Sequence, residues 1–167
     1  MVNRENQTSY SFRQATDADY DFLYKLHVLA LRPYVELLWG WEETWQQEYF
    51  KRKFNPLTRK IIQIEGWDAG VLVVQHHPQQ IYIALIEVMP EFQGRGVGTA
   101  ILTELCSQAR ACNKAVTLHV LKSNHPARRL YEKSGFVIAS EEEHRIKMIK
   151  RFQKYQLGVS RDIQDNH

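Results

Sequence analysis

A carboxylate and a glycine-rich turn lie close together in the middle of this sequence. Glu87 and Val88 end an apolar run, residues 81–88, that has the length and composition of a strand. A short turn follows, and residues 93–98 (QGRGVG) then open an amphipathic helical pattern that reaches about residue 113. Backbone N–H groups in the first turn of a helix lack intrahelical partners and lie at the positive end of the helix dipole. The spacing therefore predicts an anion-binding turn at residues 93–98, with Glu87 just upstream, near the reacting atoms.

The glycine-rich turn by itself leaves two interpretations open. It lacks the Lys-Ser/Thr ending of a nucleotide P-loop and the full spacing of a dinucleotide fingerprint. A tight turn that is merely rich in glycine is therefore the alternative to a phosphate site. A second stretch, residues 124–136 (NHPARRLYEKSGF), places Asn124 before a short helix that starts near Pro126, contains Tyr131 and ends at Gly135.

Together, these two stretches resemble two signatures of the GCN5-related N-acetyltransferase superfamily. Residues 93–98 resemble its acetyl-CoA turn, Gln/Arg-x-x-Gly-x-Gly/Ala, and residues 124–136 resemble its Asn-x-x-Ala-x-x-Leu-Tyr-x-x-x-Gly-Phe element. The resemblance covers about residues 59–152, whereas the N-terminal helical region resembles the family only in the order of its elements. It implies an N-acetyltransferase that uses acetyl-CoA as co-substrate.

The resemblance also implies how acetyl-CoA would be held. The strand that carries Glu87 is expected to bulge and to splay from the strand at residues 115–120, so that the pantetheine arm bonds to strand backbone in the gap. Backbone N–H groups of residues 93–99 would hold the pyrophosphate, because glycines let the backbone approach without a Cβ in the way. The expected cofactor-binding residues are Val88, Gln93, Gly94, Arg95, Gly96, Val97, Gly98, Thr99, Asn124 and Arg128.

The implied chemistry is the transfer of an acyl group from a thioester to an amine. An alkyl amine with a pKa near ~10 must lose a proton before it attacks, and Glu87 is the expected base, directly or through water. The Val88 N–H is the expected donor to the developing oxyanion, and Tyr131 matches the family tyrosine that protonates or hydrogen-bonds the departing sulfur. The alternatives are a Glu87 that faces solvent or pairs with a lysine, a Tyr131 that only packs, and an Asn124 that only caps its helix.

An acidic, aromatic segment is the candidate acceptor site. Residues 32–50 carry three of the four tryptophans and four carboxylates. Pro33 is expected to break or restart the helix that begins near Ala18, and Gly40 to separate two helical pieces, 33–39 and 42–54. Such a wall suits a positively charged amine; the alternative is that the aromatic side chains pack this helical layer onto the sheet. The residues predicted to contact substrate are Glu36, Trp39, Trp41 and Glu42.

The remaining pattern alternates strands with helices. Strands are expected near residues 10–15, 59–65, 71–76, 81–88, 115–120, 136–140 and 146–152. The sum is an α/β (α+β) fold, in which the resemblance implies a mixed, mostly antiparallel central sheet of about seven strands with helices on both faces. Residues 1–152 are expected to form one domain, and residues 153–167 a polar tail.

Composition narrows the classes of partner. The net charge of +3 is too small to indicate nucleic acid binding, and no apolar run approaches the ~20 residues of a membrane span. Cys106 and Cys112 fall on different faces of one helix, so a disulfide between them is not expected. Two unpaired cysteines and a chain start without a secretory pattern predict a cytoplasmic location. No metal site is expected, since His76 and His77 point to opposite faces of a strand end.

Three functions remain open at this point. The first is an N-acetyltransferase that acts on a small cationic amine through a ternary complex. The second is the same chemistry on a protein lysine or N-terminal amine, and the third is a non-catalytic acetyl-CoA-binding regulator. The hairpin at residues 136–152 offers an edge for a homodimer.

Overall fold

The computed structural model describes residues 8–153, which form one seven-stranded sheet with helices on both faces. The sheet has the strand order β1-β2-β3-β4-β5-β7-β6. Only the β4–β5 pair is parallel among these strands, so the predicted mixed, mostly antiparallel α/β fold is confirmed. The strands are β1 (Tyr10–Gln14), β2 (Lys60–Ile64), β3 (Trp67–His76), β4 (Gln80–Val88), β5 (Ala115–Leu121), β6 (Val137–Glu141) and β7 (Arg145–Lys150).

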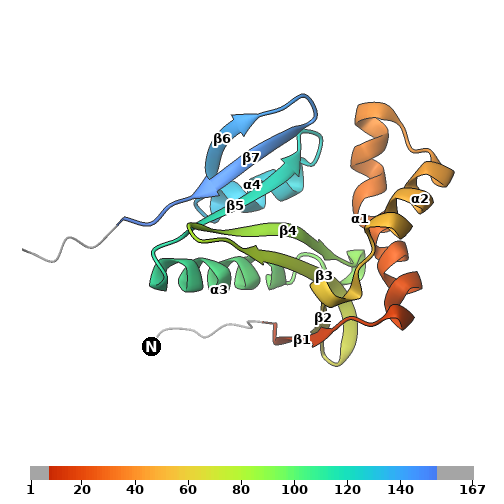
Figure 1. The fold of residues 1–167 in the computed structure, drawn as a ribbon, viewed down its shortest axis with the longest axis horizontal. Coiled ribbons are helices and arrows are strands. Elements are labelled where there is room, and N and C mark those ends of the chain that lie inside the picture. The colour runs from red at the N-terminus through yellow and green to blue at the C-terminus, as the bar shows by residue number, and fades with distance from the viewer. Residues whose placement is uncertain (1–7, 154–167) are drawn as a thin grey trace, which may run out of the picture.

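Helices cover both faces of the sheet within the described part of the chain, as Figure 1 shows. Helices α1 (Tyr20–Trp39) and α2 (Glu43–Lys53) lie together at one side, and their buried Leu23, Leu26 and Phe50 pack on the sheet with Ile61. Helices α3 (Val97–Ala111) and α4 (His125–Lys133) contribute to the larger cluster on the opposite face. Three short 3-10 turns complete the elements: η1 (Asp17–Asp19), η2 (Pro56–Thr58) and η3 (Pro90–Phe92).

Strands β4 and β5 diverge after a short parallel ladder. The ladder joins residues 80–83 to residues 115–118 and stops at the Ile83–Leu118 pair. On the other side of β4, Val73 pairs with Leu85 and Val74 with Ile83, so Ala84 is the extra residue of a β-bulge. The bulge and the splay expected for the strand of Glu87 are therefore both present, and they leave the last residues of β4 without a strand partner on the β5 side.

The prediction that Pro33 breaks or restarts the first helix is wrong, because α1 is continuous from Tyr20 to Trp39. A proline inside a helix lacks the N–H that would bond the carbonyl four residues earlier, at a cost of about 3 kcal/mol. Contacts beyond the proline offset this cost, since Val35 is buried. The Ser123 hydroxyl also donates to the carbonyl of Tyr34 over 2.8 Å. Tertiary packing thus overrides the local signal.

Other boundaries are close to those expected. Helix α1 starts two residues later than predicted, because Thr16 and Asp19 first form a capping box around η1. Gly40 does separate α1 from α2, with φ of 84°. Cys106 and Cys112 are both free, the first buried and the second exposed. No helix in the described range is long and apolar enough to cross a membrane, and the predicted tail lies outside that range from residue 154 onward.

Candidate active site

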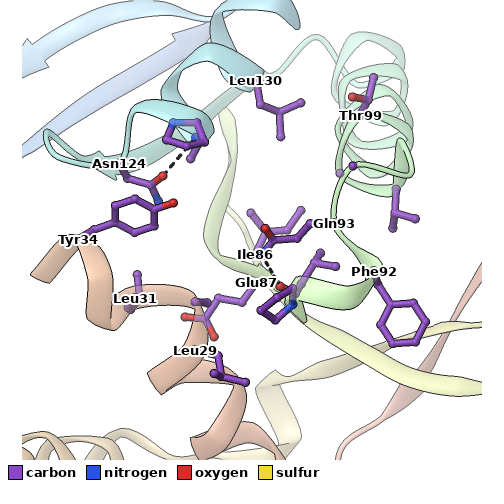
Figure 2. Close-up of a pocket in the computed structure, with 18 of the residues that line it drawn as sticks. Leu29, Leu31, Tyr34, Ile86, Glu87, Phe92, Gln93, Thr99, Asn124 and Leu130 are labelled. Carbon is purple, nitrogen blue, oxygen red and sulfur yellow. Dashed lines mark hydrogen bonds between the residues drawn. The ribbon is translucent and has the colours of Figure 1, made fainter.

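A cavity of about 460 Å³ opens where β4 and β5 diverge. Its walls come from α1, the end of β4, the glycine-rich turn, the start of α3, and α4 (Figure 2). Most of the site residues predicted from the sequence line this one space. They are Glu87, Val88, Gln93, Gly94, Gly96, Val97, Gly98, Thr99, Asn124 and Tyr131.

The backbone of β4 presents free groups to the gap. The Met89 N–H donates to the Ala69 carbonyl over 2.7 Å, so this part of the strand bonds β3 through alternate residues. The Glu87 carbonyl also faces β3, because a Cβ on Gly70 would lie 2.4 Å from it. The N–H and carbonyl of Val88 consequently point the other way, into the gap, where the Gln93 side-chain amide donates to that carbonyl over 2.8 Å.

The glycine-rich turn uses backbone conformations that favour glycine. Gly94 and Gly96 adopt φ of 73° and 79°, in the left-handed region that favours glycine. Gly96 caps α3 without a side-chain hydrogen bond, and the first intrahelical N–H bond at this end runs from Ala100 to the Gly96 carbonyl. The N–H groups of residues 97–99 are therefore the free donors of the helix end, which suits a bound phosphate.

Gly98 lets helices α3 and α4 approach closely beside the cavity. A Cβ at this position would lie 3.2 Å from Cδ2 of Leu130. Gly98 and Leu130 both line the cavity, so this close packing shapes one of its walls.

Three side chains expected to contact the cofactor are engaged elsewhere. Gln93 bonds the carbonyl of Val88. Arg95 donates to the Glu91 carbonyl over 3.1 Å and lies over the ring of Phe92 at 5.1 Å. Arg128 pairs with Glu132 over 2.9 Å. Arg95 and Arg128 are not among the residues that line the cavity, and their contacts with a cofactor stay predictions.

Asn124 and Tyr131 each have a structural contact and also line the cavity. The sequence analysis had left helix capping by Asn124 and ring packing by Tyr131 as alternatives to roles at the cofactor. The Asn124 carboxamide oxygen caps α4 by accepting from the Ala127 N–H over 3.2 Å. The Tyr131 ring packs 6.0 Å from that of Phe136, centroid to centroid. Both residues line the cavity. Burial raises the pKa of the Tyr131 phenol to about 12, so it is an O–H donor at neutral pH.

Glu87 is buried beneath α1, with a side chain that is 4% exposed. Figure 2 shows it directed toward α1, where Leu29 and Leu31 lie. Its Oε1 lies 3.5 Å from Nδ1 of His27. Glu87 therefore neither faces solvent nor pairs with a lysine, as the alternative interpretation had it.

The sequence analysis missed two basic neighbours of Glu87. His27 lies on α1 next to buried Leu26, and Arg59 directly precedes β2. The buried Arg59 guanidinium feels the charge of Glu87, which opposes the lowering of its pKa by burial. These residues lie 60 and 28 positions from Glu87, so neither spacing nor periodicity connects them to it.

The predicted acceptor residues lie away from the cavity. Glu36 pairs with Arg32 over 2.7 Å, and the Trp39 ring lies 4.8 Å from that of His144. The Trp41 indole N–H donates to Glu43 over 2.9 Å, and the Glu42 carboxylate caps α2. Their contact with an acceptor stays a prediction. The wall of the cavity on this side is instead formed by Leu29, Ala30, Leu31, Pro33 and Tyr34 of α1, none of which the sequence analysis predicted to contact substrate.

A family comparison identifies the class of protein that this fold and cavity define. The model of the acetyltransferase (GNAT) family matches residues 23–136. The chain therefore belongs to this family, which uses acetyl-CoA, and it is an acyltransferase. No curated protein matches the chain. Among its described residues, no group of three or more His, Cys, Asp or Glu side chains is placed to hold a metal ion.

Solved structures share the fold at low sequence identity. PH1933 from Pyrococcus horikoshii OT3 is 19% identical with a TM-score of 0.66, covering 87% of this chain and 100% of its own. PaiA N-acetyltransferase from Thermoplasma acidophilum, solved with coenzyme A, is 14% identical with a TM-score of 0.66, covering 86% and 99%. Arabidopsis thaliana Naa50, solved with the bisubstrate analogue CoA-Ac-MVNAL, is 19% identical with a TM-score of 0.60, covering 86% and 99%.

Proposed function

We propose that this protein transfers an acetyl group from acetyl-CoA to a primary amine by direct attack within a ternary complex. One observation carries the proposal: a buried carboxylate, a free strand N–H and a buried phenol line the same cavity, which ends at the free N-terminus of α3. Those four features are what amine activation, oxyanion stabilisation, thiol release and phosphate binding require.

The residues around the gap fit acetyl-CoA. The outward-facing N–H and carbonyl of Val88 offer a strand edge to an extended amide chain. The N–H groups of residues 97–99 offer an anion site, and it is open because the N-cap residue, Gly96, has no side chain that could bond them. Acetyl-CoA supplies the thioester-activated acetyl group, and these backbone groups would orient it.

Glu87 is the proposed base for the amine. Among the described residues that line the cavity it is the one carboxylate, so it is also the group that recognises an ammonium ion. An ammonium with a pKa near ~10 must lose a proton to attack, and a carboxylate can take it directly or through one water.

Val88 and Tyr131 are proposed to act on the other side of the reacting carbon. The Val88 N–H would donate to the acetyl oxygen as negative charge develops there. The Tyr131 hydroxyl would donate to the departing sulfur. With a pKa of about 12 the phenol is a weaker acid than a thiol of pKa ~8.5, so it is suited to donate a hydrogen bond rather than to give up its proton.

The acceptor is proposed to be a small cationic amine. Leu29, Leu31 and Tyr34 of α1 line the cavity beside Glu87, so an apolar substituent next to the amino group would contact them. A protein N-terminal amine is the second candidate, because the half-exposed Trp39 contacts His144 of the β6–β7 turn and offers surface for a longer acceptor. A cytoplasmic location and a homodimer through the β6–β7 hairpin remain further predictions.

Thiol release from acetyl-CoA tests the proposal. Purified protein is assayed against a panel of alkyl diamines, polyamines, amino-acid amides and short peptides with free N-termini. Turnover with small amines and not with peptides supports the first candidate, and the reverse supports the second. Tight CoA binding with no thiol release from any acceptor would contradict the proposal and favour a sensor.

A further inference from the structure

Two basic side chains lie near Glu87 without lining the cavity. His27 approaches from α1, and Arg59 approaches from the segment before β2. Neither is among the cavity-lining residues, so neither is placed to touch a substrate there. Any part they play in the reaction must pass through Glu87.

His27 is the closer of the two. Its Nδ1 lies 3.5 Å from the Glu87 Oε1, beyond a good hydrogen bond but close enough to become one with a small rotation. That oxygen is buried and has no hydrogen-bond partner among the described residues. Buried polar atoms are almost always partnered, so an unpartnered carboxylate oxygen facing an imidazole indicates a contact that forms during function.

Arg59 is packed on aromatic rings. Its guanidinium lies over the rings of Phe50 and Phe54, at 5.5 and 5.8 Å. Its Nε is buried and also lacks a partner within residues 8–153. The charge of Glu87 opposes the lowering of the Arg59 pKa by burial.

The stoichiometry of amine acetylation explains why Glu87 needs such neighbours. The nitrogen of an ammonium ion loses two protons as the N–C bond forms and the C–S bond breaks. The departing thiolate takes up one of them, and the other must reach solvent. The side chain of Glu87 is 4% exposed and that of His27 is 13% exposed, so His27 is the more accessible of the two to water.

We propose that His27 accepts from Glu87 the proton taken from the amine and passes it to solvent. His27 is a positioning residue that acts through Glu87, and the inference rests on the function proposed above. In the sequence of steps, Glu87 takes a proton from nitrogen, Nδ1 of His27 takes that proton from Glu87, and the ring releases a proton to water.

Other charged groups near His27 are already engaged with one another. The Trp41 ring, 6.2 Å from that of His27, donates its N–H to Glu43. Glu43 also accepts from the Tyr24 hydroxyl, and Arg32 lies over Trp41. Glu87 is thus the charged group within the described residues that faces His27.

Ring-conserving variants of His27 test the relay. His27→Phe keeps the aromatic packing against Phe50, 5.2 Å away, and removes both nitrogens. We expect kcat at neutral pH to fall on the order of 100-fold, the lower end for acid–base groups, with the KM for acetyl-CoA unchanged. His27→Gln should behave alike, and added imidazole should restore much of the activity of His27→Ala. His76→Ala, an exposed histidine on β3, is the matched control and should turn over like the wild type.

A His27→Phe protein that folds, binds CoA and retains wild-type kcat across the pH range would overturn the relay. Failure of the wild type to acetylate any amine would instead overturn the proposed function.

A readout without turnover separates those two failures. The carboxyl ¹³C signal of Glu87 is followed from about pH 4 to 9 in the free protein. Two coupled groups titrate in two steps, so the wild type should show two changes and His27→Phe one. A single change in both proteins would overturn the coupling of His27 to Glu87, whatever the acetylation assay finds.

Discussion

Replacing Tyr131 with phenylalanine should slow acetyl transfer without weakening the binding of CoA. The change removes one hydroxyl from the cavity and keeps the ring that packs on Phe136. The size of the effect follows from the pKa of about 12 that burial gives this phenol. Transfer of its proton to a thiolate of pKa ~8.5 would be uphill by about 3.5 units, or roughly 5 kcal/mol.

Tyr131 is therefore expected to contribute a hydrogen bond to a charged sulfur. Such a bond contributes about 1.5–3 kcal/mol, which corresponds to a decrease in kcat of roughly 10-fold to 150-fold. The pH profile gives a second check: the phenol is the donor form below about pH 12, so it should impose no basic limb near neutral pH.

The assay is steady-state release of thiol, with CoA affinity measured separately by calorimetry. We expect a lower kcat for Tyr131→Phe, an unchanged dissociation constant for CoA and an unchanged acidic limb. A loss of CoA affinity as large as the loss in kcat/KM would refute the reasoning, because it would place the hydroxyl in cofactor binding. So would a basic limb near neutral pH that disappears in the variant.

Other perturbations test the wall, the helix and the N-terminal ion pairs. Gly98→Val should widen the space between α3 and α4, since even a Cβ there would meet Leu130 at 3.2 Å; calorimetry should show at least 10-fold weaker CoA binding, with circular dichroism of the folded protein retained. Pro33→Ala restores a helical donor in α1 and should raise the free energy of unfolding by about 2–2.5 kcal/mol in urea titrations, the interior penalty less the entropy that proline removes from the unfolded chain. Asp19, whose pKa the Arg13 guanidinium lowers to about 2, stabilises the fold above the ordinary aspartate pKa of ~3.9. That contribution should be lost as the pH falls from about 4 to 2, and Asp19→Asn should show a smaller loss of stability over the same range.

The parts of the fold that short-range patterns determine were predicted from the sequence. Strand alternation, the glycine-rich turn before a helix and the cap at Asn124 are local features, and each occurs where expected. The divergence of β4 from β5 was implied by the family resemblance that the two motifs carry. Glu87, Val88 and Tyr131 line one cavity, and their catalytic roles stay predictions.

The features that were missed depend on tertiary contacts. Pro33 remains inside α1 because packing beyond it offsets the lost hydrogen bond. Arg95 and Arg128 bond neighbours within four residues, a choice of side-chain rotamer that a motif does not encode. His27 lies beside Glu87 only when α1 has packed against β4, and Arg59 senses the charge of Glu87 only in the folded chain.

The same limit applies to the acceptor. The tryptophans and carboxylates of residues 32–50 suggested a binding wall, yet Glu42 caps a helix and Trp41 bonds Glu43. The side chains that line the cavity from α1, such as Leu29 and Leu31, look like ordinary helix residues in the sequence. Their role follows from the helix orientation, which depends on contacts with β4 and the β5–α4 loop.

A crystal structure with CoA bound would test the central claim most directly. We expect the pyrophosphate at the N–H groups of residues 97–99, the pantetheine arm along the free edge of β4, and the sulfur within hydrogen-bond reach of the Tyr131 hydroxyl. The Glu87 carboxylate should lie on the acceptor side of the thiol. CoA bound away from the β4–β5 gap, or a sulfur remote from Val88 and Tyr131, would contradict the account.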